Sequence, residues 1–271
     1  MDAPETIRFS LTVQYDGGAF HGWQVQPDLR TVQGVLQDAM SRLGDRPCTV
    51  LGSGRTDTGV HATGQVAAVD MPAKWTASVL AASLDAVLPE DVRVAAVHVA
   101  RPDFHPRYDA LTRTYEYRIG SSREAGSPFH RRWCWPLGEV LDETLLVAAS
   151  SCIIGRHSFL ALSKSGQPER GEECTIHEAE WSEWDHGPRL TVRADRYLHH
   201  MVRYLVGTMV HIARGRRPLH DLTGLLEKSA GLTTSPPAPP QGLFLTHVEY
   251  PDSVLLGQDA NPSETRSTAT A

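Results

Sequence analysis

Apolar residues occupy every second position from Ile7 to Tyr15, with mainly polar residues between them. A period of two is typical of a half-buried strand, which the Gly17-Gly18 pair would end. Helical spacing follows, with apolar residues at positions 32, 35, 36, 40 and 43. Thr31 is a candidate N-cap for this helix, and Gly44 stands where the helix would stop.

The rest of the chain continues in the same style. The first half predicts short strands at residues 48–51 and 65–69, a helix at 76–87 and a strand at 92–99. The second half predicts strands at 112–119, 176–184, 190–194 and 243–250, and helices at 141–153, 198–213 and 219–228. Two similar α/β halves emerge. Residues 163–173 are expected to form a mobile polar loop, and the aperiodic residues beyond Pro251 a disordered tail.

Composition narrows the class of protein. Hydrophobic residues make up 41% of the chain and charged residues 21%, as in soluble globular proteins. No apolar run approaches the roughly 20 residues that a membrane-spanning helix needs, and the N-terminus lacks the pattern of a secretory signal. Four scattered cysteines without a CxxC pair favour a reducing, cytoplasmic setting and no zinc ribbon.

Net charge alone argues against a surface that binds nucleic acid everywhere, because the chain carries a formal charge of −6. Arginines are nevertheless dense in two stretches, at positions 101, 107, 113 and 118 and at positions 203, 214, 216 and 217. Two readings stay open: a basic cleft on an acidic body, or arginines solvated on the surface.

The segment from Gly52 to His61 holds three glycines, an arginine and the carboxylate of Asp57 between two predicted strands. Glycines allow a ligand to approach the main chain closely. The segment lacks the GK[ST] ending of a phosphate-binding loop and the GxGxxG spacing of a dinucleotide site. On this segment alone, a catalytic carboxylate and a glycine-rich turn capped by an aspartate are equally good interpretations.

A carboxylate that acts as nucleophile or base needs a fixed cation to keep it ionised. Arg203 is the candidate, because it lies early in a strongly apolar helix; the alternative is an arginine that reaches solvent along the helix surface. Tyr115 and Tyr117 share one face of a strand flanked by arginines, which suits unpaired bases but also ordinary β packing. Phe20, with His21 and Trp23, forms an aromatic loop that is either a substrate wall or a core plug.

Two other chemistries find no support. His199 and His200 are adjacent and so point to different helix faces, and His177-Glu178 lacks the second histidine of HExxH, so no metal site is indicated. No GxSxG motif is present, which removes the usual nucleophile elbow of hydrolases.

Together these segments resemble the tRNA pseudouridine synthase A family. The motifs follow the family's order from about residue 7 to residue 250. They are Tyr15-Asp16-Gly17, Phe20-His21-Gly22-Trp23-Gln24, Arg30-Thr31-Val32-Gln33-Gly34, Gly54-Arg55-Thr56-Asp57-Thr58-Gly59-Val60-His61-Ala62, Gly64-Gln65-Val66, Phe104-His105-Pro106-Arg107, Tyr115-Glu116-Tyr117, Phe159, Leu198-His199-His200-Met201-Val202-Arg203, Gly207, Ala238-Pro239 and Gly242-Leu243.

The resemblance implies an α/β (α+β) fold of two similar halves, each a mainly antiparallel sheet with helices on one face, meeting at a central catalytic cleft. The N-terminal half would span residues 1–107, the C-terminal half residues 108–250, and the tail residues 251–271. It also implies a homodimer that binds tRNA across both subunits and isomerises uridine in the anticodon stem-loop.

Residue roles carry over by position. Asp57 matches the catalytic aspartate, Arg203 its paired arginine and Tyr115 the tyrosine that stacks on the target base. Arg55 matches an arginine that holds the flipped-out nucleotide, and Leu243 an apolar residue that lines the pocket. Further substrate-binding positions are expected at Tyr15, Phe20, His61, His105, Arg107 and His200.

Pseudouridine formation breaks the N-glycosidic bond, rotates the uracil and joins C5 to the same sugar carbon with loss of the C5 proton. Asp57 would attack C1′ or C6, or abstract the C2′ proton so that a glycal forms; the sequence leaves all three open. Substrate and product are isomers, so no cofactor is expected. Stacking and arginine contacts must offset the roughly few kcal/mol that base flipping costs.

Some positions depart from the family pattern. Val35 and Ser158 stand where relatives carry acidic residues, which bears on how the tRNA is held more than on the reaction. Two other classes of protein are disfavoured. Asp57 together with Arg203 argues against an RNA-binding protein without activity, and the tyrosines and arginines around Tyr115 argue against a small-molecule hydrolase.

Overall fold

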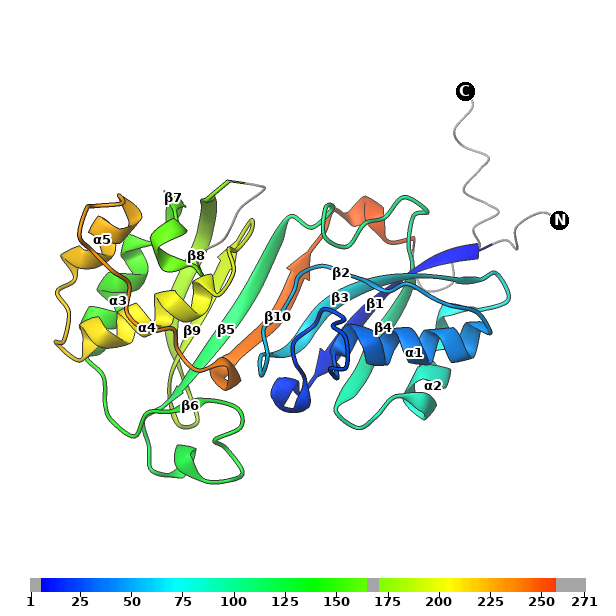
Figure 1. Cartoon of the computed structure of the whole chain (residues 1–271), viewed down its shortest axis with the longest axis horizontal. Helices are drawn as coiled ribbons and strands as arrows, with labels where there is room; N and C mark the ends of the chain where they lie inside the picture. The colour runs from blue at the N-terminus through cyan, green and yellow to red at the C-terminus, as the bar shows by residue number, and fades with distance from the viewer. Residues whose placement is uncertain (1–5, 165–170, 257–271) are drawn as a thin grey trace. The chain divides into compact units, whose positions relative to one another are not determined.

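The computed structural model describes residues 6–164 and 171–256 of the chain. These residues divide into two compact units (Figure 1): the described residues up to 111 together with 248–256, and the described residues between 112 and 247. Each unit has a mainly antiparallel sheet with helices, and the predicted α+β class is confirmed. Among the described residues, no helix is both long and apolar enough to cross a membrane.

The sheet of the first unit is built around β1 (Thr6–Tyr15), which pairs antiparallel with β3 (His61–Pro72) on one side and β4 (Val92–Val99) on the other. The short β2 (Leu51–Gly52) extends this sheet beyond β3. The alternation predicted for β1 holds, because Phe9, Leu11 and Val13 are all fully buried.

Two helices cover one face of this sheet (Figure 1): α1 (Val32–Gly44) and α2 (Ala77–Val87). Each begins where a threonine hydroxyl caps it, Thr31 accepting from Gly34 N and Thr76 from Val79 N. The leucines and Met40 on the inner faces of the helices are fully buried, and each such side chain stabilises the fold by roughly 1.5–3 kcal/mol.

The sheet of the second unit runs in the order β10 (Leu243–Glu249), β5 (Thr112–Gly120), β9 (Gly187–Ala194), β8 (Glu173–Trp184) and β7 (Gly155–Ser158). The pairs β5–β9, β9–β8 and β8–β7 are antiparallel. The two-residue β6 (Trp135–Pro136) pairs parallel with the end of β5. The division between the units falls at Leu111, and the last residues of β10, from Val248 on, belong to the first unit.

Three helices complete the second unit: α3 (Glu143–Cys152), α4 (Met201–Ala213) and α5 (His220–Leu226). Helix α3 packs on α4 and β8 (Figure 1), and the apolar stripe of α4 is buried throughout. Helix α4 begins at residue 201 rather than 198, because His200 has a left-handed backbone with φ 63°.

Short 3₁₀ turns punctuate both units. They are η1 (Gly17–Ala19), η2 (Glu124–Gly126), η3 (Leu160–Leu162), η4 (Pro240–Gly242) and η5 (Asp252–Val254). The first residues of the predicted tail return to β4, since Leu256 N donates to Val99 O and Val254 is 1% exposed. The rest of the predicted tail and most of the predicted polar loop lie outside the described residues.

Candidate functional site

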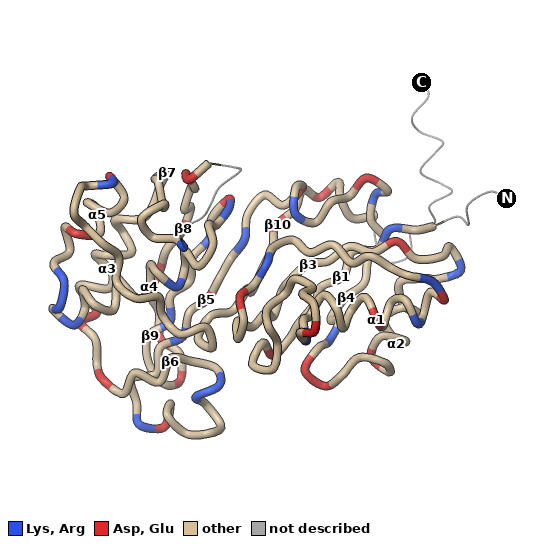
Figure 2. The backbone as a smooth tube through the Cα atoms, viewed as in Figure 1, with Lys and Arg blue, Asp and Glu red and all other residues tan. Residues whose placement is uncertain are grey.

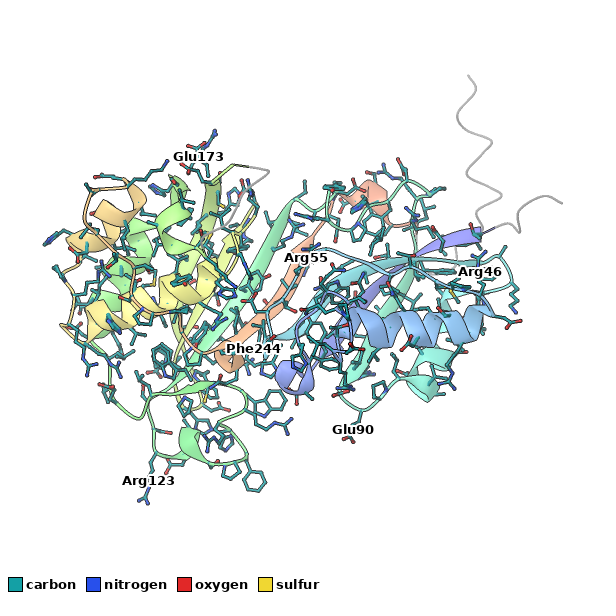
Figure 3. The ribbon with its side chains drawn as sticks, viewed as in Figure 1. Arg46, Arg55, Glu90, Arg123, Glu173 and Phe244 are labelled. Carbon is teal, nitrogen blue, oxygen red and sulfur yellow. The ribbon has the colours of Figure 1, made fainter. Side chains whose placement is uncertain are left out.

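Asp57 lies in the loop of residues 53–60 that joins β2 to β3. Its side chain is half-buried, whereas Thr56 is only 7% exposed. Arg55 and Thr58 are exposed, and Figure 3 shows where Arg55 leaves this loop. The loop is therefore anchored at Thr56 and presents the side chains of both neighbours.

Thr56 is held at both its side chain and its main chain. The Tyr15 hydroxyl lies 2.8 Å from Thr56 Oγ1 in the interior, and Trp23 N donates to Thr56 O at 3.0 Å. Tyr15 is 5% exposed and its ring meets Trp23 at 6.2 Å between centroids. A tyrosine at this depth fixes the residue next to Asp57.

A second set of hydrogen bonds fixes the start of the loop. Ser53 Oγ donates to Gln65 Oε1 at 2.6 Å, and Gln65 Nε2 donates to Gly54 O at 2.9 Å. Both side chains are buried, so the bonds are shielded from water. The loop thus begins and continues on fixed backbone, which limits how far Asp57 can move.

Two glycines outside the loop, Gly17 and Gly22, are required because the backbone of the Asp57 loop passes directly against them. A Cβ on Gly17 would lie 2.0 Å from Val60 O, and one on Gly22 would lie 2.6 Å from Thr56 O. Gly22 also has φ +83°, a conformation that L side chains rarely adopt. The glycine-rich segment before α1 and the Asp57 loop are therefore packed backbone to backbone.

Phe20 and His61 are interior residues in the structure. Phe20 is 1% exposed with the Arg30 guanidinium 4.1 Å above its ring, which favours the core plug over the substrate wall. Gly17 N donates to His61 Nδ1 at 3.0 Å, so that nitrogen accepts and the ring proton resides on Nε2. Asp16 Oδ1 also lies 3.2 Å from His61 Nδ1.

His105 and Arg107 lie on the connection after β4. His105 Nδ1 accepts from Arg107 N at 3.1 Å, and its ring stacks on Tyr108 at 4.1 Å. Burial lowers the pKa of His105 from its usual value, and the nearby Asp109 opposes this shift. Arg107 is exposed.

In the second unit, Arg203 lies in the first turn of α4 and is tied to Ala238 twice. Its Nε donates to Ala238 O at 2.8 Å, while Ala238 N donates to Arg203 O at 2.9 Å. A cation in the first turn opposes the helix dipole, so this arginine is not there to stabilise the helix. The contacts fix the Arg203 guanidinium against the chain at Ala238.

Tyr115 is seated on a residue that the sequence patterns did not single out. Its ring meets Tyr197 edge-on, with centroids 4.9 Å apart. The Tyr197 hydroxyl lies 3.1 Å from Arg113 O and 2.9 Å from Val192 O, and burial raises its pKa well above 10. Tyr115 itself is 8% exposed. The sequence offered one indication of a role for Tyr197, which is that it directly precedes the Leu198–Arg203 motif.

Leu243 and His200 complete the predicted set in this unit. Leu243 is 5% exposed at the start of β10, directly after Gly242, where a Cβ would lie 2.8 Å from the Tyr117 ring. The Tyr117 hydroxyl donates to Pro239 O at 2.7 Å. His200 precedes α4, and its ring meets that of His199 edge-on with centroids 4.1 Å apart.

Several arginines of the two dense stretches serve the fold of the second unit. Arg113 Nη1 donates to Asp195 O, and the Arg118 guanidinium lies 4.4 Å above the Phe244 ring. Arg214 pairs with Glu139, and Arg217 Nε lies 3.0 Å from Asp221. These side chains are therefore not simply solvated on the surface.

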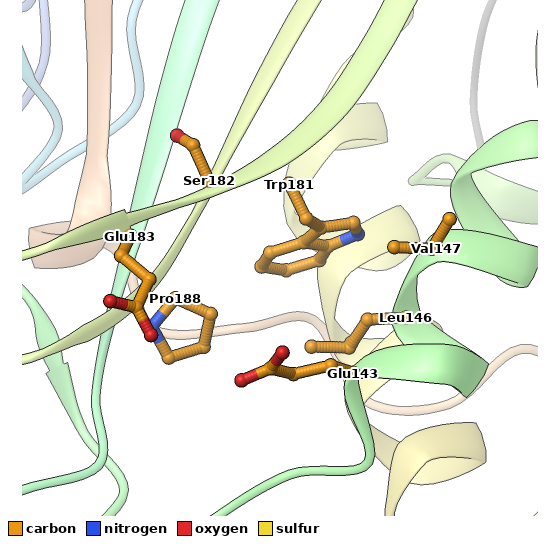
Figure 4. A pocket seen from close by; sticks show the side chains of 7 residues that line it. All are labelled: Glu143, Leu146, Val147, Trp181, Ser182, Glu183 and Pro188. Atoms are coloured by element: carbon orange, nitrogen blue, oxygen red, sulfur yellow. The ribbon is translucent and has the colours of Figure 1, made fainter.

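A cavity of about 100 Å³ lies between α3 and the hairpin of β8 and β9 (Figure 4). Leu146, Val147 and Trp181 give it an apolar floor, and Glu143 and Glu183 flank it. No predicted site residue lines this cavity. Its two carboxylates would repel a phosphate backbone, so it does not bear on RNA chemistry.

Comparisons with known proteins agree with these motifs. The family described as "tRNA pseudouridine synthase" matches residues 11–109 and 149–251. Similar proteins named tRNA pseudouridine synthase A include those of Methylacidiphilum infernorum, 35% identical over 90% of this chain and 96% of the relative, and Solibacter usitatus, 37% identical over 90% and 99%. That of Latilactobacillus sakei is 36% identical over 90% of this chain and 99% of the relative.

Proposed function

The chain belongs to the tRNA pseudouridine synthase family and is thus an isomerase that makes pseudouridine from uridine; we propose that it acts on the anticodon stem-loop of tRNA with Asp57 as the reacting carboxylate. The observation that carries the role of Asp57 is the loop of residues 53–60. Asp57 is half-buried there, directly after the buried and doubly held Thr56. Fixed geometry of this kind is what a catalytic group requires.

The carboxylate has to make the N-glycosidic bond labile. It adds to C1′ or C6 of the flipped uridine, or removes the C2′ proton, so that the N-glycosidic bond breaks without loss of the uracil. After the base rotates, C5 bonds to C1′ and the carboxylate is released, or in the glycal route returns its proton to C2′. N1 takes up a proton as the C5 proton leaves to solvent. The reaction is redox-neutral, and every atom of the substrate apart from that exchanged proton is retained in the product.

Arg203 and Tyr115 are proposed to act with Asp57, as the resemblance implies. The guanidinium of Arg203 would hold the carboxylate ionised, and its bonds to Ala238 support the idea of a preset cation. The ring of Tyr115, supported by Tyr197, would stack on the flipped base. Arg55, exposed two residues before Asp57, would hold the phosphate of the flipped nucleotide.

The other predicted positions fall into two groups: residues that hold the Asp57 loop in place and residues that would contact RNA. Tyr15, Phe20 and His61 are 5%, 1% and 1% exposed, and we assign them to holding the loop and its neighbours. Arg107 is exposed, His105 lies on the connection after β4, and His200 and Leu243 lie at the starts of α4 and β10; contact of these residues with RNA stays a prediction. A homodimer and a cytoplasmic setting also stay predictions from the sequence.

A transcript of tRNA labelled with tritium at uridine C5 tests the activity and its place together. We expect the wild-type protein to release tritium and chemical mapping to locate the new pseudouridine in the anticodon stem-loop. Pseudouridine formed elsewhere in the tRNA would overturn the proposed specificity while keeping the family activity. Tight binding of tRNA with no tritium released would instead indicate an RNA-binding protein. A protein that neither binds tRNA nor releases tritium would indicate a small-molecule enzyme.

A further inference from the structure

Between β5 and α3 the chain makes a positively charged loop that the reaction does not use. Residues 121–138, here called the arginine–aromatic loop, carry three arginines and one glutamate in a chain whose formal net charge is −6. The same residues include Phe129, His130 and Trp133. Positive charge and aromatic rings therefore concentrate on one segment of a protein that is acidic as a whole.

The loop is held by buried residues and successive turns. Ala125 and Cys134 are fully buried, and a Cβ on Gly120 would lie 2.2 Å from Ala125 Cβ. Backbone bonds close three turns in a row, at Ser127 N to Glu124 O, His130 N to Ser127 O and Trp133 N to His130 O, each 2.8–3.1 Å long. A ligand would thus meet a preformed surface, which lowers the entropy cost of binding.

The loop displays an exposed aromatic ring and exposed arginines. Phe129 is 82% exposed, and Arg123 and Arg131 are exposed on either side of it in sequence. Figure 3 shows Arg123 pointing away from the ribbon at the loop's tip, and Figure 2 shows the blue arginine positions along the loop near β6. The His130 ring contacts that of His186 at a tilt of 52° with centroids 4.2 Å apart, and His186 meets Trp184 edge-on at 4.9 Å.

We propose that the arginine–aromatic loop binds RNA outside the reaction site, with Arg123 and Arg131 contacting phosphates and Phe129 stacking on an unpaired base. The inference rests on the proposed function, because a tRNA is far larger than the one nucleotide that reacts. A single exposed ring is ordinary on a protein surface. An exposed ring on a loop of fixed backbone turns, together with exposed guanidiniums on the same loop, offers the π face and the cations that the bases and phosphates of single-stranded RNA take up.

Protein and membrane partners fit less well. An apolar docking site would need a contiguous patch, whereas Phe129 is flanked by Pro128 and His130 and then by Ser127 and Arg131. A membrane surface would need several apolar anchors beside the cations. The charge of the loop complements an anionic polymer, and the substrate of the family supplies one.

The affinity of full-length tRNA transcript, measured by fluorescence anisotropy at several salt concentrations, tests the inference. Arg123→Gln with Arg131→Gln is expected to weaken binding by about tenfold and to reduce the slope of log K against log salt by about one to two. Phe129→Ala is expected to weaken binding by about fivefold, and Phe129→Tyr, which keeps the π face, to bind as the wild type does. Tritium release at saturating tRNA should change by less than about twofold in all of these variants.

Arg42→Gln with Arg93→Gln is the matched control, since both arginines are exposed in the first unit and the charge change is identical. Loop variants whose affinity and salt slope equal those of this control would overturn the inference, as would loss of turnover at saturating tRNA with unchanged affinity. Failure of the proposed function is distinguishable, because a wild type that releases no tritium while the loop variants still bind less tightly would reject the chemistry and retain the loop's role.

Discussion

Tyr197 links the predicted stacking residue to the sheet beneath it. Its buried hydroxyl lies within hydrogen-bond distance of carbonyls on β5 and β9, and its ring supports Tyr115. Tyr197→Phe should lower the free energy of unfolding by about 1 kcal/mol, the usual contribution of one hydrogen bond. Urea denaturation measures this; Tyr204→Phe, a half-buried tyrosine of α4, is the control, and an equal loss in both variants would contradict the assignment.

His211 makes stability depend on pH. Burial, and then the charges of Arg214, Arg216 and Arg217, lower the pKa of His211 from 6.5. Between the folded pKa and about 6.5 the unfolded chain binds more protons, so the free energy of unfolding should fall as pH drops through this window. Titration by NMR should show a pKa below 6.5, and His211→Gln should flatten the pH dependence of urea denaturation. A pKa at or above 6.5 would refute the expectation.

At the scale of elements, the Asp57 loop depends on the segment before α1. Gly22→Ala places a Cβ 2.6 Å from Thr56 O at a residue with φ +83°, so either the loop or the segment must move. We expect a loss of roughly 1–3 kcal/mol in the free energy of unfolding and at least a tenfold loss of tritium release. Gly126→Ala, where the Cβ would meet nothing within 4 Å, should change neither by much. A fully active Gly22→Ala would show that the packing of this loop is irrelevant.

The sequence predicts those helices and strands whose boundaries are set by residues close by in the chain. The N-caps Thr31 and Thr76 act within three residues, so both helices begin where expected. The start of α4 was predicted three residues early, because the left-handed turn at His200 leaves no mark in the apolar pattern. Strands β6 and β7, of two and four residues, are too short for a period to show.

The candidate site likewise has a part that adjacent residues reveal and a part that depends on contacts between distant residues. The Gly52–His61 segment was recognisable because glycines, an arginine and a carboxylate are adjacent in sequence. The partners that hold it lie far away along the chain: Tyr15 and Trp23 bind Thr56 from about 30 to 40 residues before it. Ala238 holds Arg203 from 35 residues beyond. Such contacts arise only in the folded chain, and composition does not reveal them.

At the scale of the whole molecule, the chain leaves the first unit at Leu111 and returns to it within β10. Its last described residues add to that unit: Leu255 bridges Ala100, and Val254 is 1% exposed. Val254→Ala should therefore lower the free energy of unfolding by about 2 kcal/mol, through lost burial and the cavity left behind. Thermal and urea unfolding measure it, with the exposed Val140→Ala as control. A change below about 0.5 kcal/mol would show that this return contributes little.

The most direct test of the account is single-turnover tritium release by Asp57→Asn, which keeps the size of the side chain and removes its charge. The account predicts that the variant binds tRNA within about threefold of the wild type, unfolds at the same urea concentration and releases no tritium above background. Release of tritium at more than about a tenth of the wild-type rate would contradict the assignment of the Asp57 carboxylate as the reacting group.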